Sequence, residues 1–243
     1  MPLSQTDWHQ RYLQQAQWTR QLRSHFFAKF NLPRTAAILE AGCGTGAVLG
    51  DYANTQSTFG LDIDPNAIFF CQQASPQIRL TCGDAHVLPY ADASFDLTFC
   101  HYLLLWLDDP LQALQEMKRV TRPGGWVCAF AEPDYGGRVT HPQALAKLAD
   151  VQVQSLRMQG ASTGMGRQLN QLFHQCGTRE IKCGVLAAEW HGNTSQLEGE
   201  LQMMRADLAA TGKEREFQEH QKEFQKKEGA VYFIPTFYAA GRA

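Results

Sequence analysis

The chain has 243 residues, of which 44% are hydrophobic, 11% aromatic and 19% charged, as in an ordinary soluble globular protein with a large core. This composition excludes a disordered or fibrous chain. Lys and Arg number 22 against 24 Asp and Glu, so the formal net charge of −2 predicts no general attraction to nucleic acid or to a membrane. The seven cysteines are scattered without a C-x-x-C pair, and the polar amino end lacks a signal-peptide pattern. We therefore expect free thiols and a cytoplasmic location.

The first predicted element is helical. Residues 7–30 place apolar side chains at mixed three- and four-residue spacings, which predicts one amphipathic helix or two short ones before Pro33. Such a segment either packs on the core or closes over a pocket as a lid. Periodicity alone favours packing.

From residue 36, short apolar runs that end in Gly or Asp alternate with helical stretches. The runs cover residues 36–42, 57–64, 77–84, 95–102 and 124–133. This rhythm predicts successive βαβ units, and so a doubly wound α/β fold with a parallel sheet covered by helices on both faces. Because ligands of such sheets bind beyond the carboxyl ends of the strands, the residues that follow each run are the candidates for chemistry.

The carboxyl-terminal part is predicted to add helices and two late strands. Helices are expected near residues 142–158 and 167–176, a strand at 180–190, a helical stretch at 192–229 and a closing strand at 231–241. Pro235 argues that the closing strand lies at an edge or contains a bulge, because proline cannot donate to a sheet ladder.

The most informative motif is ILEAGCGTG, residues 38–46. A predicted strand carrying Glu40 ends in Gly42, Gly44 and Gly46. Glycines at alternate positions allow the backbone to approach a ligand closely and to turn into a helix with free N–H groups. A tight turn would not need three glycines after a buried carboxylate, so the motif indicates a binding loop.

A second acidic residue follows at the end of the next predicted strand. Asp62 lies in GLDID, close to the spacing of about 20 residues at which a carboxylate reaches the ribose hydroxyls of a nucleotide. The glycines also fit the G-x-G-x-x-A pattern of dinucleotide enzymes, so a nicotinamide-dependent oxidoreductase is an alternative. Glu40 would repel a diphosphate, whereas it suits the ammonium and sulfonium of S-adenosylmethionine.

The ordered motifs together resemble one family. E-x-G-x-G-x-G at 40–46, Asp62, GDA at 83–85, FDLTFCHYLLLWL at 95–107 and RPGG at 122–125 are similar to those of the class I S-adenosylmethionine-dependent methyltransferases, in the methyltransferase-11 or UbiE-like branch. The resemblance covers about residues 36–135. It implies a Rossmann-like seven-stranded sheet whose last strand is antiparallel, with a helical cap.

The resemblance also implies a cofactor site. Glycines 42, 44 and 46 would line the methionyl part, Glu40 would organise the ammonium region, and Asp62 would hold the ribose hydroxyls. Around the adenine the resemblance places Ile63, Asp84 and the backbone of Ala85, and it gives the carbonyl of Cys100 to the ammonium. Aromatic residues ahead of the glycine motif close over the cofactor in this family, which makes Tyr12 and Trp18 lid candidates.

The acceptor side is expected after the fourth and fifth runs. His101 is the candidate general base, with hydrogen bonding inside the pocket wall as an equal alternative. Residues that could contact an acceptor, including an acidic group for the arginine, are Tyr102, Trp106, Asp134, Tyr135 and Arg167. No metal-ligand spacing is present, so no metal is predicted.

The sequence therefore predicts a single methyltransferase domain, with lid helices in residues 1–34, a cofactor core in 35–134 and a cap and late strands in 135–243. It would methylate a small molecule at oxygen, nitrogen or carbon, as a monomer or homodimer, with no nucleic-acid or membrane partner. A non-catalytic protein that binds S-adenosylmethionine remains a further alternative.

Overall fold

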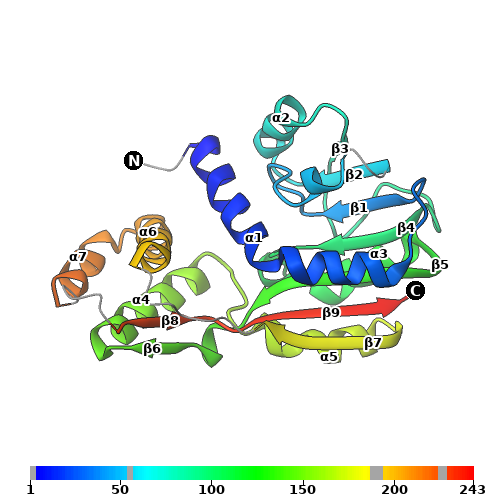
Figure 1. Ribbon diagram of the computed structural model, residues 1–243. Coiled ribbons are helices and arrows are strands. Elements are labelled where there is room, and N and C mark those ends of the chain that lie inside the picture. The colour runs from blue at the N-terminus through cyan, green and yellow to red at the C-terminus, as the bar shows by residue number, and fades with distance from the viewer. Residues whose placement is uncertain (1–3, 54–56, 187–193, 224–228) are drawn as a thin grey trace.

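A computed structural model describes residues 4–53, 57–186, 194–223 and 229–243 of the chain. Its central feature is a seven-stranded sheet in the order β3-β2-β1-β4-β5-β9-β7 (Figure 1). The strands are β1 (Ala37–Ala41), β2 (Ser57–Asp62), β3 (Arg79–Cys82), β4 (Phe95–Cys100), β5 (Thr121–Pro133), β7 (Arg179–Leu186) and β9 (Thr236–Arg242). The first five pair in parallel, whereas β9 is antiparallel to both β5 and β7. The predicted fold class, including the reversed last strand, is confirmed.

Helices cover both faces of the sheet. One face packs against α1 (Gln5–Phe30) and α2 (Pro65–Ala74), and the other against α3 (Pro110–Val120) and α5 (Met165–Gln175). Each face has its own hydrophobic cluster, and strand β4 contributes Leu97 and Phe99 to the first and Phe95 and Cys100 to the second. The central strands β1, β4 and the second half of β5 are therefore buried on both sides, which is why their sequences read as continuous apolar runs.

The closing strand differs from its prediction. Residues 231–241 form two strands, β8 (Val231–Phe233) and β9, which are separated at Pro235. β9 is not at an edge but lies between β5 and β7, while β8 pairs with β6 (Val139–His141) in a separate two-stranded sheet. Proline lies in the gap between the two sheets, where no ladder hydrogen bond is required of it. The expected strand at 180–190 is described only to Leu186, and residues 187–190 lie outside the described part.

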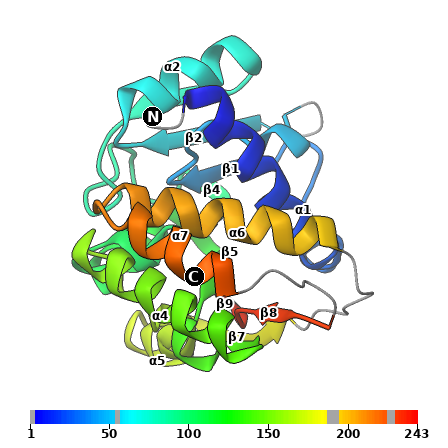
Figure 2. The same ribbon diagram turned by 90° about the vertical axis from the view of Figure 1, so that its left-hand side faces the viewer.

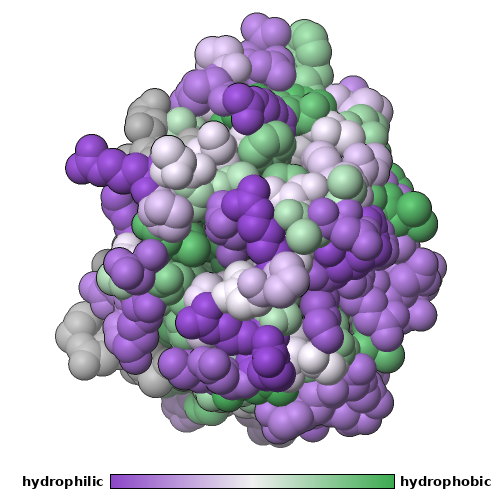
Figure 3. All heavy atoms as spheres, turned by 90° about the vertical axis from the view of Figure 1, so that its right-hand side faces the viewer, coloured by the Kyte–Doolittle hydropathy of each residue, from purple (hydrophilic) through white to green (hydrophobic). Residues whose placement is uncertain are grey.

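A cap lies beyond the carboxyl ends of the parallel strands. It consists of the β6–β8 pair with α4 (Gln143–Met158), α6 (Thr194–Ala209) and α7 (Glu214–Glu223), and it has its own apolar cluster around Leu148, Met204 and Tyr232 (Figure 1). Viewed from that end, α6 crosses in front of the strand ends and the amino-terminal half of α1 lies beside it (Figure 2). The opposite end of the molecule is mostly hydrophilic (Figure 3).

The amino-terminal segment forms one continuous helix, α1. Ser4 caps it by accepting from the N–H of Asp7, whose side chain accepts in return, and Asn31 ends it in the left-handed conformation. The buried face of its carboxyl-terminal half carries Phe26 and Phe30, and Phe30 stacks on Trp126 of β5 at 4.3 Å between ring centroids. No helix in the described ranges is long and apolar enough to cross a membrane.

This packing predicts a contrast between two phenylalanines. Phe30 is 8% exposed against the sheet, whereas Phe69 on α2 is 68% exposed. We expect Phe30→Ala to lower the free energy of unfolding by about 3–5 kcal/mol because it opens a cavity. Phe69→Ala, the matched control, should change it by less than about 0.5 kcal/mol. Urea unfolding measures both, and equal losses would contradict the placement of α1 on the core.

Candidate active site

The glycine motif forms the turn that follows β1. Gly42, Gly44 and Gly46 have φ angles of 70°, 49° and 79°, in the left-handed region that favours glycine. A Cβ on Gly42 would lie 2.6 Å from Leu103 Cδ1, so a side chain there would collide with the loop after β4. The N–H groups of Gly42 and Cys43 both donate to the carbonyl of Leu61, which fixes the turn against the end of β2.

Asp62 holds the same turn from the side. Its Oδ2 accepts the N–H of Gly44 at 2.6 Å and its Oδ1 accepts the N–H of Asp64 at 3.0 Å. The carboxylate is half-buried, and each oxygen keeps a second lone pair for a ligand hydroxyl. The next side chain, Ile63, is 70% exposed and presents an apolar surface beside the turn.

Glu40 lies behind the turn as a buried carboxyl group. It is 2% exposed, accepts the N–H of Leu49, and its Oε2 has no hydrogen-bond partner among the described residues. Burial raises the pKa of Glu40 well above its usual range, and the nearby positive charge of Arg23 opposes that rise. An unsatisfied buried oxygen of this kind is suited to a ligand that brings a donor or a positive charge.

Helix α1 covers the turn. His9 Nδ1 lies 2.8 Å from Thr45 Oγ1, and the ring of Tyr12 would be 3.6 Å from a Cβ on Gly44. Tyr12 is therefore placed over the glycine turn, as a lid residue would be. Trp18, the other lid candidate, is 37% exposed, and no ring contact of its side chain is described.

Farther along α1, Arg23 is a buried charge that links the helix to the site. Its side chain is fully buried, Nη1 donates to Thr19 Oγ1 and, at 2.7 Å, to the carbonyl of Ala16, and Nη2 donates to Asp51 at 2.9 Å. Asp51 follows the glycine turn directly. Neither Arg23 nor Thr19 was among the predicted site residues, although they lie three and seven residues before Phe26, which placed them on the buried face.

His101 contacts this network. Its Nε2 lies 2.8 Å from Thr19 Oγ1, and its ring meets the ring of Tyr102 edge-on. Burial, helped by the charge of Arg23, lowers the pKa of His101 to about 3. The ring is therefore neutral at pH 7, and a base of this strength is poorly matched to accepting a proton at that pH.

The other predicted cofactor residues follow the strands as expected from the parallel sheet. Cys100 ends β4 and is completely buried, and Ala85 is 6% exposed after β3. Asp84 Oδ1 accepts the N–H of His86 at 2.8 Å and lies 2.7 Å from its Nδ1, and these bonds lower the pKa of Asp84. Half of the Asp84 side chain is exposed, so it can still reach a ligand.

The structure pairs two of the predicted acceptor residues with each other. Asp134 is 3% exposed, and its carboxylate accepts Nε and Nη2 of Arg167 at 2.5 and 2.8 Å and the N–H groups of Gly136 and Gly137. Its accepting capacity is therefore used within the protein. Tyr135 begins the following turn, and Trp106, 46% exposed, ends the turn after β4.

A carboxylate that sequence reasoning missed organises the acceptor side. Glu132, near the end of β5, is completely buried and accepts the N–H groups of three consecutive residues at 2.9–3.1 Å, namely Leu103, Leu104 and Leu105. It thereby fixes the turn after β4 that packs against Gly42. Burial raises the pKa of Glu132 to about 8, against the effect of the three hydrogen bonds. In the sequence, a single carboxylate in the otherwise apolar run CAFAEP was the signal that could have indicated a buried functional group.

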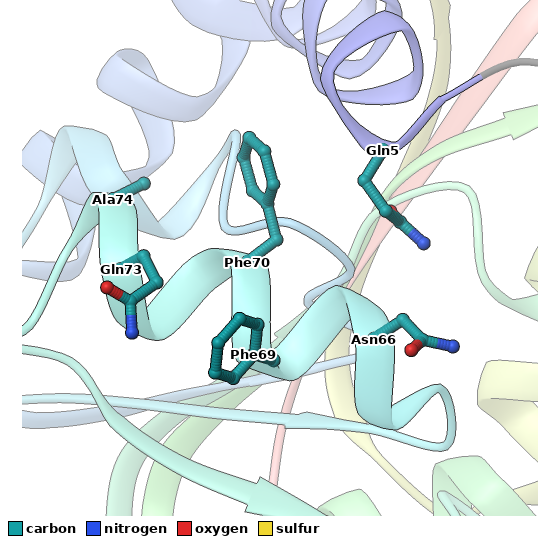
Figure 4. Close-up of a pocket in the computed structure, with 6 residues that line it drawn as sticks. All are labelled: Gln5, Asn66, Phe69, Phe70, Gln73 and Ala74. Atoms are coloured by element: carbon teal, nitrogen blue, oxygen red, sulfur yellow. The ribbon is translucent and has the colours of Figure 1, made fainter.

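A separate hollow of about 490 Å³ lies along α2. Figure 4 shows the exposed Phe69 and the ring of Phe70 beside Asn66 and Gln73, with Gln5 of α1 facing them. Phe70 also contacts His9, at 4.9 Å between ring centroids. In the described ranges no three His, Cys, Asp or Glu side chains form a group that could hold a metal ion.

The sheet order, the antiparallel β9 and the glycine turn flanked by Glu40 and Asp62 define a class I methyltransferase fold. Residues 39–129 match the family model of a methyltransferase domain. A malonyl-[acyl-carrier protein] O-methyltransferase of Pseudescherichia vulneris is 34% identical over 119 residues, 49% of this chain and 47% of that protein. A demethylmenaquinone methyltransferase of Renibacterium salmoninarum is 35% identical over 102 residues, 41% of this chain and 43% of that protein.

Solved structures agree on the fold. A putative methyltransferase from Bacillus halodurans superimposes with a TM-score of 0.63 at 13% identity, covering 90% of this chain and 97% of that one. The resemblance to S-adenosylmethionine-dependent methyltransferases that the sequence predicted is confirmed: residues 39–129 match a methyltransferase domain, and a demethylmenaquinone methyltransferase is among the similar proteins. The matches cover about half of the length of these curated relatives.

S-adenosylmethionine is the cofactor of this family, and the residues present fit it. The three glycines of the turn carry no side chain that would block the close approach of a ligand, Glu40 has an unsatisfied buried oxygen, and Ile63 offers an exposed apolar side chain after β2. A dinucleotide would instead place its diphosphate against two carboxylates. The nicotinamide alternative is therefore not supported.

The pKa of Glu132 leads to a prediction about stability and pH. A carboxyl group whose pKa rises from 4.5 to about 8 on folding stabilises the protein below pH 4.5, and this contribution is lost as the pH rises toward 8. Glu132→Gln cannot ionise, and its amide would also face a backbone N–H, which costs about 1–3 kcal/mol at low pH. We expect the wild type to have the larger unfolding free energy, from urea titrations, at low pH and Glu132→Gln to have the larger one at pH 8, because ionisation costs the wild type more than the amide costs the variant. A constant difference would contradict the raised pKa.

Proposed function

We propose that the protein transfers the methyl group of S-adenosylmethionine to a small-molecule acceptor, at oxygen, nitrogen or carbon. The observation that carries this proposal is the buried carboxyl of Glu40, whose Oε2 lacks a donor directly behind the glycine turn. A positively charged ligand beside it would satisfy that oxygen and favour the ionised form of Glu40. The methyltransferase family whose model matches residues 39–129 supports the same ligand.

The chain's own residues would hold the cofactor from three sides. The glycine turn would face the methionyl part, with Glu40 behind it and the carbonyl of Cys100 toward the ammonium. Asp62 would accept the ribose hydroxyls, and Ile63 would cover the adenine. Asp84, with half of its side chain exposed, and the backbone of Ala85 would bond the adenine edge.

When bound, the cofactor would supply an electrophilic methyl group, to which a nucleophile of the acceptor bonds in line as the carbon–sulfur bond breaks and S-adenosylhomocysteine leaves. The protein then has to hold the acceptor in line and to exclude water, and little covalent machinery is needed. Helix α1 would help to exclude water, because Tyr12 lies over the glycine turn, and the cap would complete the enclosure. Glu132 would help to position the acceptor, because it fixes the turn that carries Tyr102 and Trp106.

The acceptor itself is left open by the relatives, whose names specify chemically unrelated acceptors, a malonyl group on a carrier protein and a quinone. Tyr102, Trp106 and Tyr135 are the aromatic residues that the structure brings to the carboxyl edge of β4 and β5. Tritium transfer from labelled S-adenosylmethionine into a metabolite extract tests the proposal. Labelled product supports it, whereas tight binding of S-adenosylhomocysteine without transfer would favour a non-catalytic binding protein.

The cofactor assignment predicts two losses of affinity. Glu40→Gln and Asp62→Ala should each weaken the binding of S-adenosylhomocysteine by about 1–3 kcal/mol, because each leaves a ligand donor unpaired. Asp92→Asn is the control, since Asp92 is exposed and pairs with Arg119 far from the turn. Isothermal calorimetry measures all three, and wild-type affinity in both site variants would refute the assignment.

The environment of His101 predicts how its variants should differ. Gln at this position can keep a hydrogen bond to Thr19, whereas Ala removes it. We therefore expect His101→Gln to retain most of the methyl transfer and His101→Ala to lose more of it. The rates of the wild type and of His101→Gln should depend on pH in the same way near pH 6.5. A general base would behave otherwise, since both variants would lose about 10²–10⁴-fold.

A further inference from the structure

Arg11 is an anomaly that the cofactor site does not use. It lies on α1, its side chain is 15% exposed, and its Nε and Nη1 are buried with no hydrogen-bond partner among the described residues. Its Nη2 comes only within 3.6 Å of Asp207 Oδ1 on α6, and its guanidinium lies 4.9 Å from the ring centroid of Trp8. Buried guanidinium donors without acceptors are costly, so an acceptor group is expected to reach them.

Space for a ligand is present beside this side chain. A groove of about 430 Å³ lies between α1 and α6 and is lined by side-chain amides and Arg11, with Gln10, Gln14 and Gln202 among its residues. Asp7, also at the groove, is bonded to Ser4, and Asp207 is bonded to Gln152 at 2.7 Å. Arg11 is therefore the cation among the residues that line the groove, and two of its nitrogens have no acceptor among the described residues.

The groove is next to the proposed site of methyl transfer. Tyr12, the residue after Arg11, covers Gly44. Successive side chains on a helix point about 100° apart around its axis. A ligand held by Arg11 on the α6 side would therefore lie beside Tyr12, which faces the glycine turn. The lining residues come from α1 and α6 and not from the glycine turn, which separates this groove from the cofactor's own contacts.

We propose that Arg11 binds an anionic group, a carboxylate or phosphate, of the methyl acceptor in the groove between α1 and α6. Arginine suits such a group because its planar guanidinium can donate several hydrogen bonds to oxygen anions at once. The acceptor would then be an organic anion whose reacting atom extends from the groove toward the glycine turn. This inference rests on the proposed methyl transfer and adds the chemical class of the acceptor.

The test separates the acceptors by charge before the reaction. A metabolite extract is divided on an anion exchanger at pH 7 into retained and unretained pools, and tritium transfer from S-adenosylmethionine into each pool is measured. The wild type should label chiefly the retained pool. Arg11→Gln should lower that labelling by about tenfold or more, and Arg11→Lys should restore part of it, with S-adenosylhomocysteine affinity close to wild type in both.

Two further variants separate ligand binding from a mere link between helices. Asp207→Asn removes the ion pair but leaves the donors of Arg11, so transfer into the retained pool should persist. Arg215→Gln, at a side chain 90% exposed on α7, is the charge-matched control and should match the wild type. Thermal unfolding checks that each variant is folded. If Arg11→Gln does not fold, Arg11→Lys, which keeps the charge, takes its place in the test.

Several outcomes would overturn the inference. The inference fails if the wild type labels only the unretained pool, or if the rate of methyl transfer is unchanged in both Arg11 variants. It also fails if Asp207→Asn loses as much methyl transfer as Arg11→Gln. Weaker binding of S-adenosylhomocysteine by Arg11→Gln would instead assign Arg11 to the cofactor site. Failure of the proposed function looks different, because the wild type would then label neither pool while still binding S-adenosylhomocysteine.

Discussion

The buried guanidinium of Arg23 is the interaction on which the arrangement of the site depends. A fully buried charge is costly unless it is paired and bonded. Arg23 is bonded to Thr19, to the carbonyl of Ala16 and to Asp51, and its Nε has no partner among the described residues. Thr19 and Ala16 belong to α1 itself, so the bond to Asp51 is the contact that joins the helix to the segment after the glycine turn. The same positive charge opposes the rise in the pKa of Glu40. The bond favours the placement of α1 in which Tyr12 lies over Gly44 and Thr19 contacts His101.

The sheet and its binding turn could be predicted from the sequence because they depend on local signals. Apolar runs fix the strands, and Glu40, the glycines and Asp62 follow from their spacing along one βαβ unit. The remainder depends on contacts between distant segments. No local pattern shows that Glu132 accepts the N–H groups of Leu103–Leu105, that Asp134 pairs with Arg167, or that Pro235 separates two sheets. Each of these contacts joins segments about 30 residues or more apart, so it can be inferred only once the fold is known.

The end of β5 illustrates how such distant contacts shape the acceptor side. Glu132 binds the turn after β4, and Asp134, two residues later, binds both its own following turn and Arg167 at the start of α5. Two carboxylates on one strand end thus fix three loops around the carboxyl edge of the sheet. This is the edge at which doubly wound folds bind their ligands, so the polar groups buried here favour preorganisation of the site over stability.

Helix α1 is held unequally along its length. Toward its carboxyl end Phe30 stacks on Trp126 and Arg23 has three hydrogen-bonded partners, whereas toward its amino end Arg11 meets Asp207 only at 3.6 Å and leaves two nitrogens unpaired. Separating the amino-terminal half from the cap therefore breaks a long ion pair, whereas separating the rest from the sheet breaks the Arg23–Asp51 bond and the Phe30–Trp126 stack. Tyr12 lies in that half, where His9 contacts Thr45 of the glycine turn at 2.8 Å, so the contact with the turn, more than the contact with the cap, holds this segment over the site.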